Sequence, residues 1–437
     1  MASSILHVKN SYYFDVPKAL WRADYQSMEE FPEVWIRLDP EFQLWEARRL
    51  HAALQQPIAV PPWPELRDAY LSWRGEPGNF AKPLHRMLQE QYEQSRREYR
   101  HWLREADRED RSFEAYLQQV DPPHAWFSRA MAERAVTPWR QMRTAAGDVS
   151  EYRQTGAQWS EQKMAAYNYH LSGKVLIPQP PGVRLRNLHE VESGFAISQF
   201  LVIQFFVAVV LVVLFRWLAV RAAGGDPPHG RLWNVLELML VYIRDNVARP
   251  TAGIHERDRF LPLLWTLFVF VLGCNLCGLL PWVHTPTASF GVTTGLAGVV
   301  FAVGVFVGMQ RFGPLGFFVN RIPAMRLPIV LAVFIKPLLL ALELVGLGIR
   351  HMVLAIRLLA NMMAGHMVLL GIMGLAFGAS GALLFAERPL WLWGGTAIAA
   401  VIASTLYMCL ELFVAILQAF IFTFLSAVFI SSAAHRH

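Results

Sequence analysis

The pattern of hydrophobic and polar positions divides this chain of 437 residues into two unlike parts. Over the first 190 or so residues, short helical stretches are separated by proline clusters. The clearest stretch, 84–110, has an apolar stripe flanked by alternating charges, which predicts an amphipathic helix. From about residue 195, polar positions become rare. We therefore predict a charge-rich, mainly helical N-terminal soluble extension over 1–190 and a membrane domain over 191–437.

Three apolar runs of the second part have the length of ordinary membrane spans: 197–215, 260–280 and 290–310. The segment 232–247 is amphipathic and is expected to lie along the membrane interface. Loops rich in Lys and Arg follow the first and third spans, whereas the loop between the second and third has none. The positive-inside rule then places the N-terminal extension outside and the C-terminal tail inside.

Two further apolar segments, 328–377 and 390–433, each exceed 40 residues. A helix of 45 residues is about 68 Å long, roughly twice the thickness of the hydrocarbon core. Each segment therefore either breaks into two spans or lies strongly tilted as half of a long hairpin. Because no polar loop interrupts either segment, we favour the hairpin. The predicted fold class is an all-α polytopic membrane protein of about five membrane helices that ends in a long tilted helical hairpin.

Charge and motif content narrow the possible functions. The N-terminal part holds 25 of the 40 Lys and Arg residues and 25 of the 34 Asp and Glu residues, so the membrane part carries the basic surplus. The pI near 9.3 thus reflects membrane-side charge, and no nucleic-acid partner is expected. No glycine-rich phosphate loop or catalytic constellation occurs in the N-terminal part, which favours a docking or stator-contact module over an enzyme domain.

The three cysteines all fall in apolar segments and define no disulfide framework. Cys274 and Cys277 have a spacing that metal sites use, but no second pair or histidine cluster accompanies them, so we interpret them as buried small hydrophobic residues. Neither a signal peptide nor a transit peptide is visible at the N-terminus. No cofactor and no metal are expected.

Ionisable residues recur every seven positions in the first long segment. Seven residues leave a helix only about 20° from its starting direction, so these side chains form one stripe. They are Lys336, Glu343, Arg350 and Arg357. Asn361 continues the stripe, whereas His366 faces roughly the opposite side of the helix. The second long segment repeats the spacing of seven with Ser404, Glu411 and Gln418.

Charged side chains inside a membrane helix are costly unless they are paired or hydrated. Lys336 and Arg350 have the alternative of snorkelling to an interface, with Glu343 paired to one of them. Arg357 lies far from either end of its segment, and its guanidinium always stays charged. Since Glu343 is about 21 Å away along the helix axis, we expect the partner of Arg357 on another subunit.

His366 and Glu411 form either a buried hydrogen-bonded pair or a proton relay, and their ability to titrate favours the relay. Asn361 and Gln418 do not titrate, so we expect them to order water or to contact the guanidinium.

Four motifs occur in the order NLCGLLP at 275–281, PTASFGVT at 286–293, AIRLLANMMAGH at 355–366 and ELFVAILQAFIFTFLSAVFIS at 411–431. Together they resemble subunit a of the rotary ATP synthase membrane sector, over roughly 195–437. The resemblance implies two tilted helices that wrap a ring of c subunits. It further implies a proton-conducting stator subunit that is not an enzyme by itself, with the c-ring, peripheral stalk subunits and the lipid bilayer as partners.

The resemblance also implies roles for individual residues. Arg357 matches the family's essential arginine, which meets the ring carboxylates one at a time and blocks a direct leak between two half-channels. Glu343 matches an acidic position of the inner half-channel, Arg350 a basic position beside it, and Asn275 a polar position on the second span. The positions that line the outer half-channel are Asn361, His366, Glu411 and Gln418. Some bacterial relatives carry the His and Glu of this pair in reverse.

The N-terminal part departs from the family, whose members mostly begin with a short tail. The stretch HVKNSYYFDVP at 7–17 resembles the start of some bacterial relatives, which would make 20–185 an insertion. The expected location is the bacterial inner membrane, with the mitochondrial inner membrane as the alternative. Two other classes of function are alternatives: a secondary transporter, which predicts internal repeats and broken helices, and a membrane anchor in which the stripes are coincidental.

Overall fold

The computed structural model describes most of the chain. The described residues are 10–54, 60–76, 78–79, 81–104, 112–133, 141–142, 145–155, 159–224, 230–251, 257–280, 283, 285–320, 329–377 and 390–434. They form two units: one contains the described residues up to Phe14 and from Ile197 onward, and the other is Asp15–Ala196. The start of the chain is thus grouped with the membrane helices, and the second unit lies between the two parts of the first in sequence.

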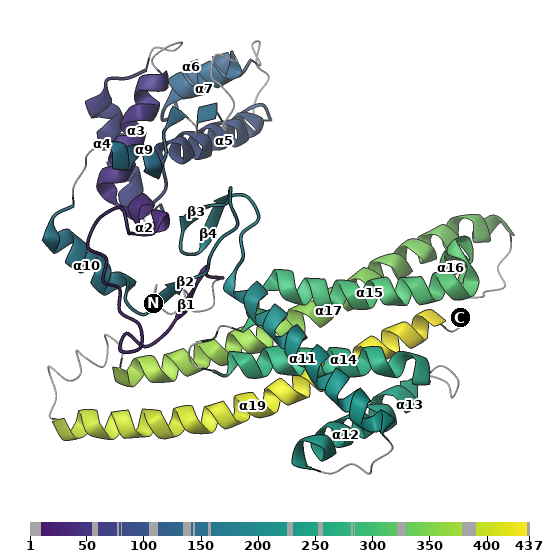
Figure 1. Ribbon diagram of the computed structural model, residues 1–437. Helices are drawn as coiled ribbons and strands as arrows, with labels where there is room; N and C mark the ends of the chain where they lie inside the picture. The colour runs from purple at the N-terminus through teal and green to yellow at the C-terminus, as the bar shows by residue number, and fades with distance from the viewer. Residues whose placement is uncertain are drawn as a thin grey trace. The chain divides into compact units, whose positions relative to one another are not determined.

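The unit Asp15–Ala196 is mainly helical (Figure 1). Its helices are α2 (Glu33–Leu38), α3 (Pro40–Leu54), α4 (Trp63–Gly75), α5 (Leu84–Trp102), α6 (Phe113–Val120), α7 (Ala125–Ala132), α9 (Val149–Gln154) and α10 (Glu161–Leu171). The amphipathic helix predicted at 84–110 is α5, and 105–110 lie outside the described residues. Buried apolar residues of α3, α4, α5 and α7 form a core of the unit Asp15–Ala196. Leu50, Tyr70, Leu88 and Phe127 are almost fully buried in it.

Short strands, which the sequence pattern did not indicate, complete this part of the chain. They are β1 (Tyr13–Asp15), β2 (Lys174–Leu176), β3 (Arg184–Asn187) and β4 (Glu190–Ser193). Strands β3 and β4 pair in antiparallel fashion, with Leu185 opposite Val191.

The membrane unit is built from helices. They are α11 (Gln199–Ala223), α12 (Arg231–Ile243), the π-helical η1 (Arg244–Ala248), α13 (Arg249–Thr251), α14 (Arg257–Gly278), the 3₁₀ turn η2 (Pro286–Ala288), α15 (Phe290–Phe312), α16 (Pro314–Asn320), α17 (Ile329–Phe377) and α19 (Leu390–Ala434). Five of them, α11, α14, α15, α17 and α19, are long and apolar enough to cross a membrane. The predicted fold class, an all-α polytopic membrane protein, is confirmed.

The two long segments are continuous helices of 49 and 45 residues, α17 and α19. The alternative in which each breaks into two spans is therefore wrong. They lie side by side in the structure (Figure 1). Because a 49-residue helix is about 74 Å long, it fits a hydrocarbon core of about 30 Å only when strongly tilted.

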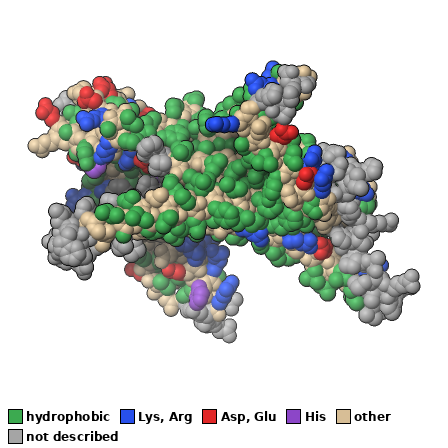
Figure 2. All heavy atoms as spheres, turned by 90° about the horizontal axis from the view of Figure 1, so that it is seen from below, with side chains coloured by type: hydrophobic (Ala, Val, Ile, Leu, Met, Phe, Trp, Pro, Cys, Tyr) green, Lys and Arg blue, Asp and Glu red, His purple; other side chains and the backbone are tan. Residues whose placement is uncertain are grey.

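Helix α19 packs against α14, α15 and α17. The shared core contains Phe268, Val300, Leu358 and Phe422, all nearly inaccessible. Many large apolar side chains on α11, α17 and α19 remain exposed, such as Phe205. Figure 2 shows one face of the molecule on which hydrophobic side chains cover a broad area with Lys and Arg at its margins. Such a surface suits lipid rather than water.

Candidate functional site

Arg357 is half-buried on α17, in an almost wholly apolar stretch of the helix. Its neighbours Leu354 and Leu358 are buried in the helix bundle. Arg357 makes no hydrogen bond or ion pair with any residue that the structure describes, and the same holds for Asn361 one turn later. A guanidinium keeps its charge in any environment. The described residues of this subunit therefore do not supply the counter-charge of Arg357.

Glu343 and Arg350 contact each other across two turns of α17. Arg350 Nη2 donates to Glu343 Oε1 at 2.7 Å, a charge-assisted hydrogen bond. The Glu343 side chain is 31% exposed and that of Arg350 is 41% exposed. Lys336 is exposed on the same stripe. The ion pair of Glu343 that belonged to the snorkelling alternative is present, with Arg350 as the cation.

His366 and Glu411 meet where α17 packs on α19. His366 Nδ1 lies 3.7 Å from Glu411 Oε1, and Glu411 is only 4% exposed. Neither carboxyl oxygen of Glu411 accepts a hydrogen bond from a described residue. Because 3.7 Å exceeds a direct hydrogen bond, only a bridging water or a small approach would connect the two groups.

The other ring nitrogen of His366 faces a threonine. Nε2 lies 2.7 Å from the hydroxyl of Thr285, which directly precedes η2 and is 2% exposed. The imidazole therefore stands between a hydroxyl on one side and a carboxyl on the other. Sequence reasoning did not select Thr285, although it belongs to the polar, charge-free loop between the second and third predicted spans.

The polar positions of α19 face the packed interior. Ser404, Glu411 and Gln418 are each at most 9% exposed, although exposed apolar residues surround them along the helix. The Ser404 hydroxyl donates to the carbonyl of Ala400 at 2.7 Å, so its hydrogen bond stays within the helix. The spacing of seven thus gives one buried polar face, as the pattern predicts.

Asn275 is fully buried on α14 and connects three elements. Its Nδ2 donates to the carbonyl of Ala415 on α19 at 3.2 Å, and its Oδ1 accepts from the Thr287 hydroxyl of η2 at 2.8 Å. A buried amide with both ends satisfied fixes its surroundings. Asn275 thereby holds η2, and Thr285 beside it, against the helix that carries Glu411.

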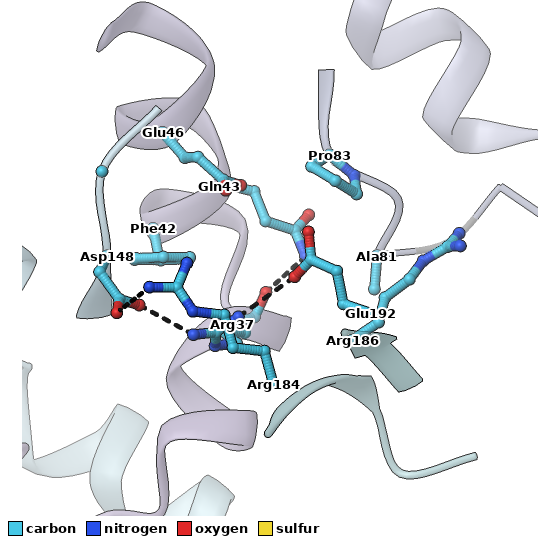
Figure 3. Close-up of a pocket in the computed structure, with 11 residues that line it drawn as sticks. Arg37, Phe42, Gln43, Glu46, Ala81, Pro83, Asp148, Arg184, Arg186 and Glu192 are labelled. Atoms are coloured by element: carbon cyan, nitrogen blue, oxygen red, sulfur yellow. Dashed lines mark hydrogen bonds and ion pairs between the residues drawn. The ribbon is translucent and has the colours of Figure 1, made fainter. Parts of the chain in front are cut away.

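A second concentration of charge lies in the unit Asp15–Ala196. Arg37 contacts Asp148 at 2.8 Å and Glu192 at 3.3 Å, and Arg184 also contacts Asp148 at 2.8 Å (Figure 3). The residues line a partly open pocket with about 30 Å³ of space for water, enough for at least one water molecule. Burial, with the charge of Glu192 adding to it, raises the pKa of the half-buried Glu46 carboxyl in this cavity to about 8.

This second cluster is better suited to joining elements than to chemistry. Arg37 of α2 reaches the residue that caps α9 and a residue of β4, and Arg184 of β3 joins the same cap. The contacts pair opposite charges within this pocket. Among the described residues, no group of three or more His, Cys, Asp or Glu is arranged to hold a metal ion.

Comparison with known proteins covers the polar residues of the membrane helices but not the charged residues around Arg37. The sequence model of the family described as ATP synthase A chain matches residues 201–431, more than half of the chain. The chain belongs to the ATP synthase A chain family. The matched range contains the polar residues of α14, α17 and α19 described above. The charged residues around Arg37 lie outside it.

Individual relatives agree with the family match. ATP synthase subunit a of Anaeromyxobacter sp. (strain Fw109-5) is 35% identical over 240 residues, which cover 54% of this chain and 54% of the relative. ATP synthase subunit a of Myxococcus xanthus is 34% identical over 216 residues, which cover 48% of this chain and 64% of the relative. The Gluconacetobacter diazotrophicus relative is 36% identical over 227 residues and 84% of its length. The chain thus spans between half and two thirds of the first two relatives.

Proposed function

We propose that the chain is the proton-conducting stator subunit of a rotary ATP synthase, and that it hydrolyses nothing itself. The observation that carries the proposal is Arg357, a permanent charge inside an apolar helix that has no counter-ion among the described residues. In a membrane such a charge marks a functional site, because an unpaired cation is too costly to keep otherwise. Family membership supplies the class of machine in which this charge acts.

Arg357 meets its counter-charges one at a time, on the carboxylates of a rotating c-ring. A cation beside each passing carboxylate favours its ionised form, so the carboxylate gives up its proton there. The same fixed charge repels protons and so blocks a direct leak past the ring. An arginine suits this role better than a lysine, since its guanidinium does not lose its charge in an apolar site.

The outer half-channel is lined by the polar residues near the contact of α17 with α19. His366 and Glu411 are the groups that take up and release the proton, because they alone of this set titrate. The non-titrating members order water or position neighbouring groups. They are Asn275, Asn361, Ser404 and Gln418. Burial of Glu411, Ser404 and Gln418 on one face of α19 supports a continuous polar route rather than scattered polar side chains.

The inner half-channel begins at Glu343 and Arg350. Their contact at 2.7 Å leaves both side chains partly exposed on the surface of α17, which is compatible with access to the carboxylate. Glu343 receives the proton released by the ring, and Arg350 keeps the carboxylate oriented. Both residues lie on the face of α17 that carries Arg357, toward the start of the helix.

The alternatives fit less well. A secondary transporter binds its substrate between interrupted helices, whereas α17 and α19 are continuous. A simple anchor leaves unexplained why polar residues repeat every seven positions in both helices. The complex resides in the bacterial inner membrane, with the unit Asp15–Ala196 on the outer side as an insertion that contacts peripheral stalk subunits.

The test replaces the guanidinium in the assembled complex. Arg357→Ala in reconstituted vesicles should abolish ATP-driven proton pumping, measured by quenching of an acridine dye, while ATP hydrolysis by the complex persists. Arg221→Ala provides the matched control, because Arg221 lies in the last turn of α11, stacked on Trp217 and outside the proposed route. Pumping that survives in Arg357→Ala at the level of the control overturns the proposal.

A further inference from the structure

Thr285 is held unusually close to the end of α14. The last residue of that helix is Gly278, and a Cβ atom placed there would lie 2.6 Å from the Cβ of Thr285 and closer still to its hydroxyl oxygen. Real Cβ atoms do not approach other atoms so closely. Only glycine at this position lets the Thr285 side chain occupy its observed place.

The loop around Thr285 is fixed on its other side as well. The Thr285 carbonyl accepts the backbone N–H of Ala288 at 3.1 Å, and Thr287 within the same turn binds the buried Asn275. Asn275 in turn binds the backbone of α19. The hydroxyl of Thr285 thus has a defined position relative to α14 and α19 before it meets His366.

We propose that Thr285 is a positioning residue of the proton path, whose hydroxyl holds Nε2 of His366 so that Nδ1 faces Glu411. The inference rests on the proposed function, in which His366 and Glu411 carry the proton. It adds a third member to that pair from a different element of the fold. The contact of 2.7 Å and the burial of Thr285 carry it.

A hydroxyl suits this position because it both donates and accepts a hydrogen bond. When His366 is neutral with its proton on Nδ1, the Thr285 hydroxyl donates to Nε2. When His366 is protonated on both nitrogens, Nε2 donates to the same oxygen. The imidazole therefore gains and loses a proton at Nε2 without losing its anchor, while its Nδ1 N–H stays directed at Glu411, which an apolar or single-role side chain does not allow.

The experiment compares two nearly isosteric replacements in the assembled complex. Thr285→Val keeps the shape and removes the hydroxyl, whereas Thr285→Ser keeps the hydroxyl and removes the methyl group. We expect ATP-driven pumping and passive proton flux in vesicles to fall about tenfold in Thr285→Val, as for the loss of one buried hydrogen bond. Thr285→Ser should retain most of the wild-type rate. All rates are normalised to the amount of assembled complex.

A double variant separates positioning from a general structural role. If Thr285 acts through His366, Thr285→Val should add no further loss to His366→Ala. Additive losses, or equal losses in Thr285→Val and Thr285→Ser, overturn the inference. Wild-type proton flux in Thr285→Val also overturns the inference about Thr285. The proposed function then still stands if proton flux is slow in His366→Ala and in Glu411→Gln. Wild-type flux in these last two variants instead refutes the proposed relay, and the inference with it.

Discussion

The imidazole of His366 on α17 lies 3.7 Å from the carboxyl of Glu411 on α19, with nothing in the local sequence of either helix to bring them together. The relationship is set by the packing of two long helices. Among the described residues, none donates a hydrogen bond to the buried carboxyl of Glu411, and this imidazole forms its ion-pair contact. The two groups therefore act as a unit, and changes to one should depend on the other.

Exchanging the two side chains tests that unit. His366→Ala or Glu411→Gln alone should slow proton pumping at least about tenfold, because each removes a group that transfers a proton. The double exchange His366→Glu with Glu411→His should recover part of the loss, since it restores one imidazole and one carboxyl at the same contact. Pumping by reconstituted complex reports the result. A double exchange slower than both single variants would argue against a paired relay.

Gly365 controls how closely α17 approaches Glu411. A Cβ atom at this position would lie 2.6 Å from Glu411 Oε1 and 3.1 Å from Cδ, so Gly365→Ala must displace the carboxyl. We expect a large loss of pumping and destabilisation of about 1–3 kcal/mol from overpacking.

Gly371→Ala is the matched control on the same helix, because a Cβ there meets no atom within 4 Å. This variant should pump normally and, as an alanine in a helix, be slightly more stable. Thermal unfolding of the purified complex and dye-quench pumping measure both effects. Equal behaviour of the two variants would contradict the role given to the close approach at Gly365.

The Glu46 carboxyl should make the unit Asp15–Ala196 sensitive to pH. Burial raises its pKa from 4.5 to about 8, so the folded state binds this proton more tightly than the unfolded state does. The stabilising contribution is complete below pH 4.5 and is lost as the pH rises through about 8. Unfolding followed by tryptophan fluorescence in the full chain should therefore shift to lower temperature across this interval.

Glu46→Gln, which cannot ionise, should remove that part of the pH dependence and be more stable than wild type above pH 8. Replacement of the exposed Glu161 by Gln serves as the control and should leave the pH profile unchanged. A profile for Glu46→Gln that matches wild type would show that another group titrates.

The unit Asp15–Ala196 should be removable as an insertion. Gln199 at the start of α11 donates its backbone N–H to the carbonyl of Ser11 at 2.9 Å, and the Ser11 hydroxyl donates to the Gln199 side chain at 2.6 Å. The two chain segments that flank the unit are thus in contact. Deleting 15–196 and joining the ends with a short Gly/Ser linker should leave assembly and pumping of the membrane part largely intact. Loss of the assembled complex would show instead that the unit is required for folding.

Hydropathy and spacing were sufficient to predict the elements of the membrane part. Each predicted span corresponds to one helix, and the segment 232–247 is α12 followed by η1. The spacing of seven also predicted that Ser404, Glu411 and Gln418 share a face, because an unbroken helix makes that relation purely local. The absence of a polar interruption in either long segment likewise predicted a single helix for each.

Contacts between elements were not predictable in this way. The place of Thr285 depends on Gly278 and on the hydrogen bonds of Asn275, which join α14 and η2 to α19, an element far away in sequence. The salt bridge of Arg37 with Glu192 depends on strand β4, which is too short to give a clear alternation. Such contacts follow from packing between elements, and they leave no periodic pattern in a single sequence.

The length of α17 has a consequence for the membrane around it. A rod of about 74 Å confined to a layer of about 30 Å must lean roughly 65° away from the membrane normal. One end then lies near one aqueous surface and the other end near the opposite surface, with the two ends displaced sideways by several helix diameters. Water that enters at one end of the helix therefore contacts a different part of it from water that enters at the other end. Lipid must fill the wedge-shaped spaces above and below the helix.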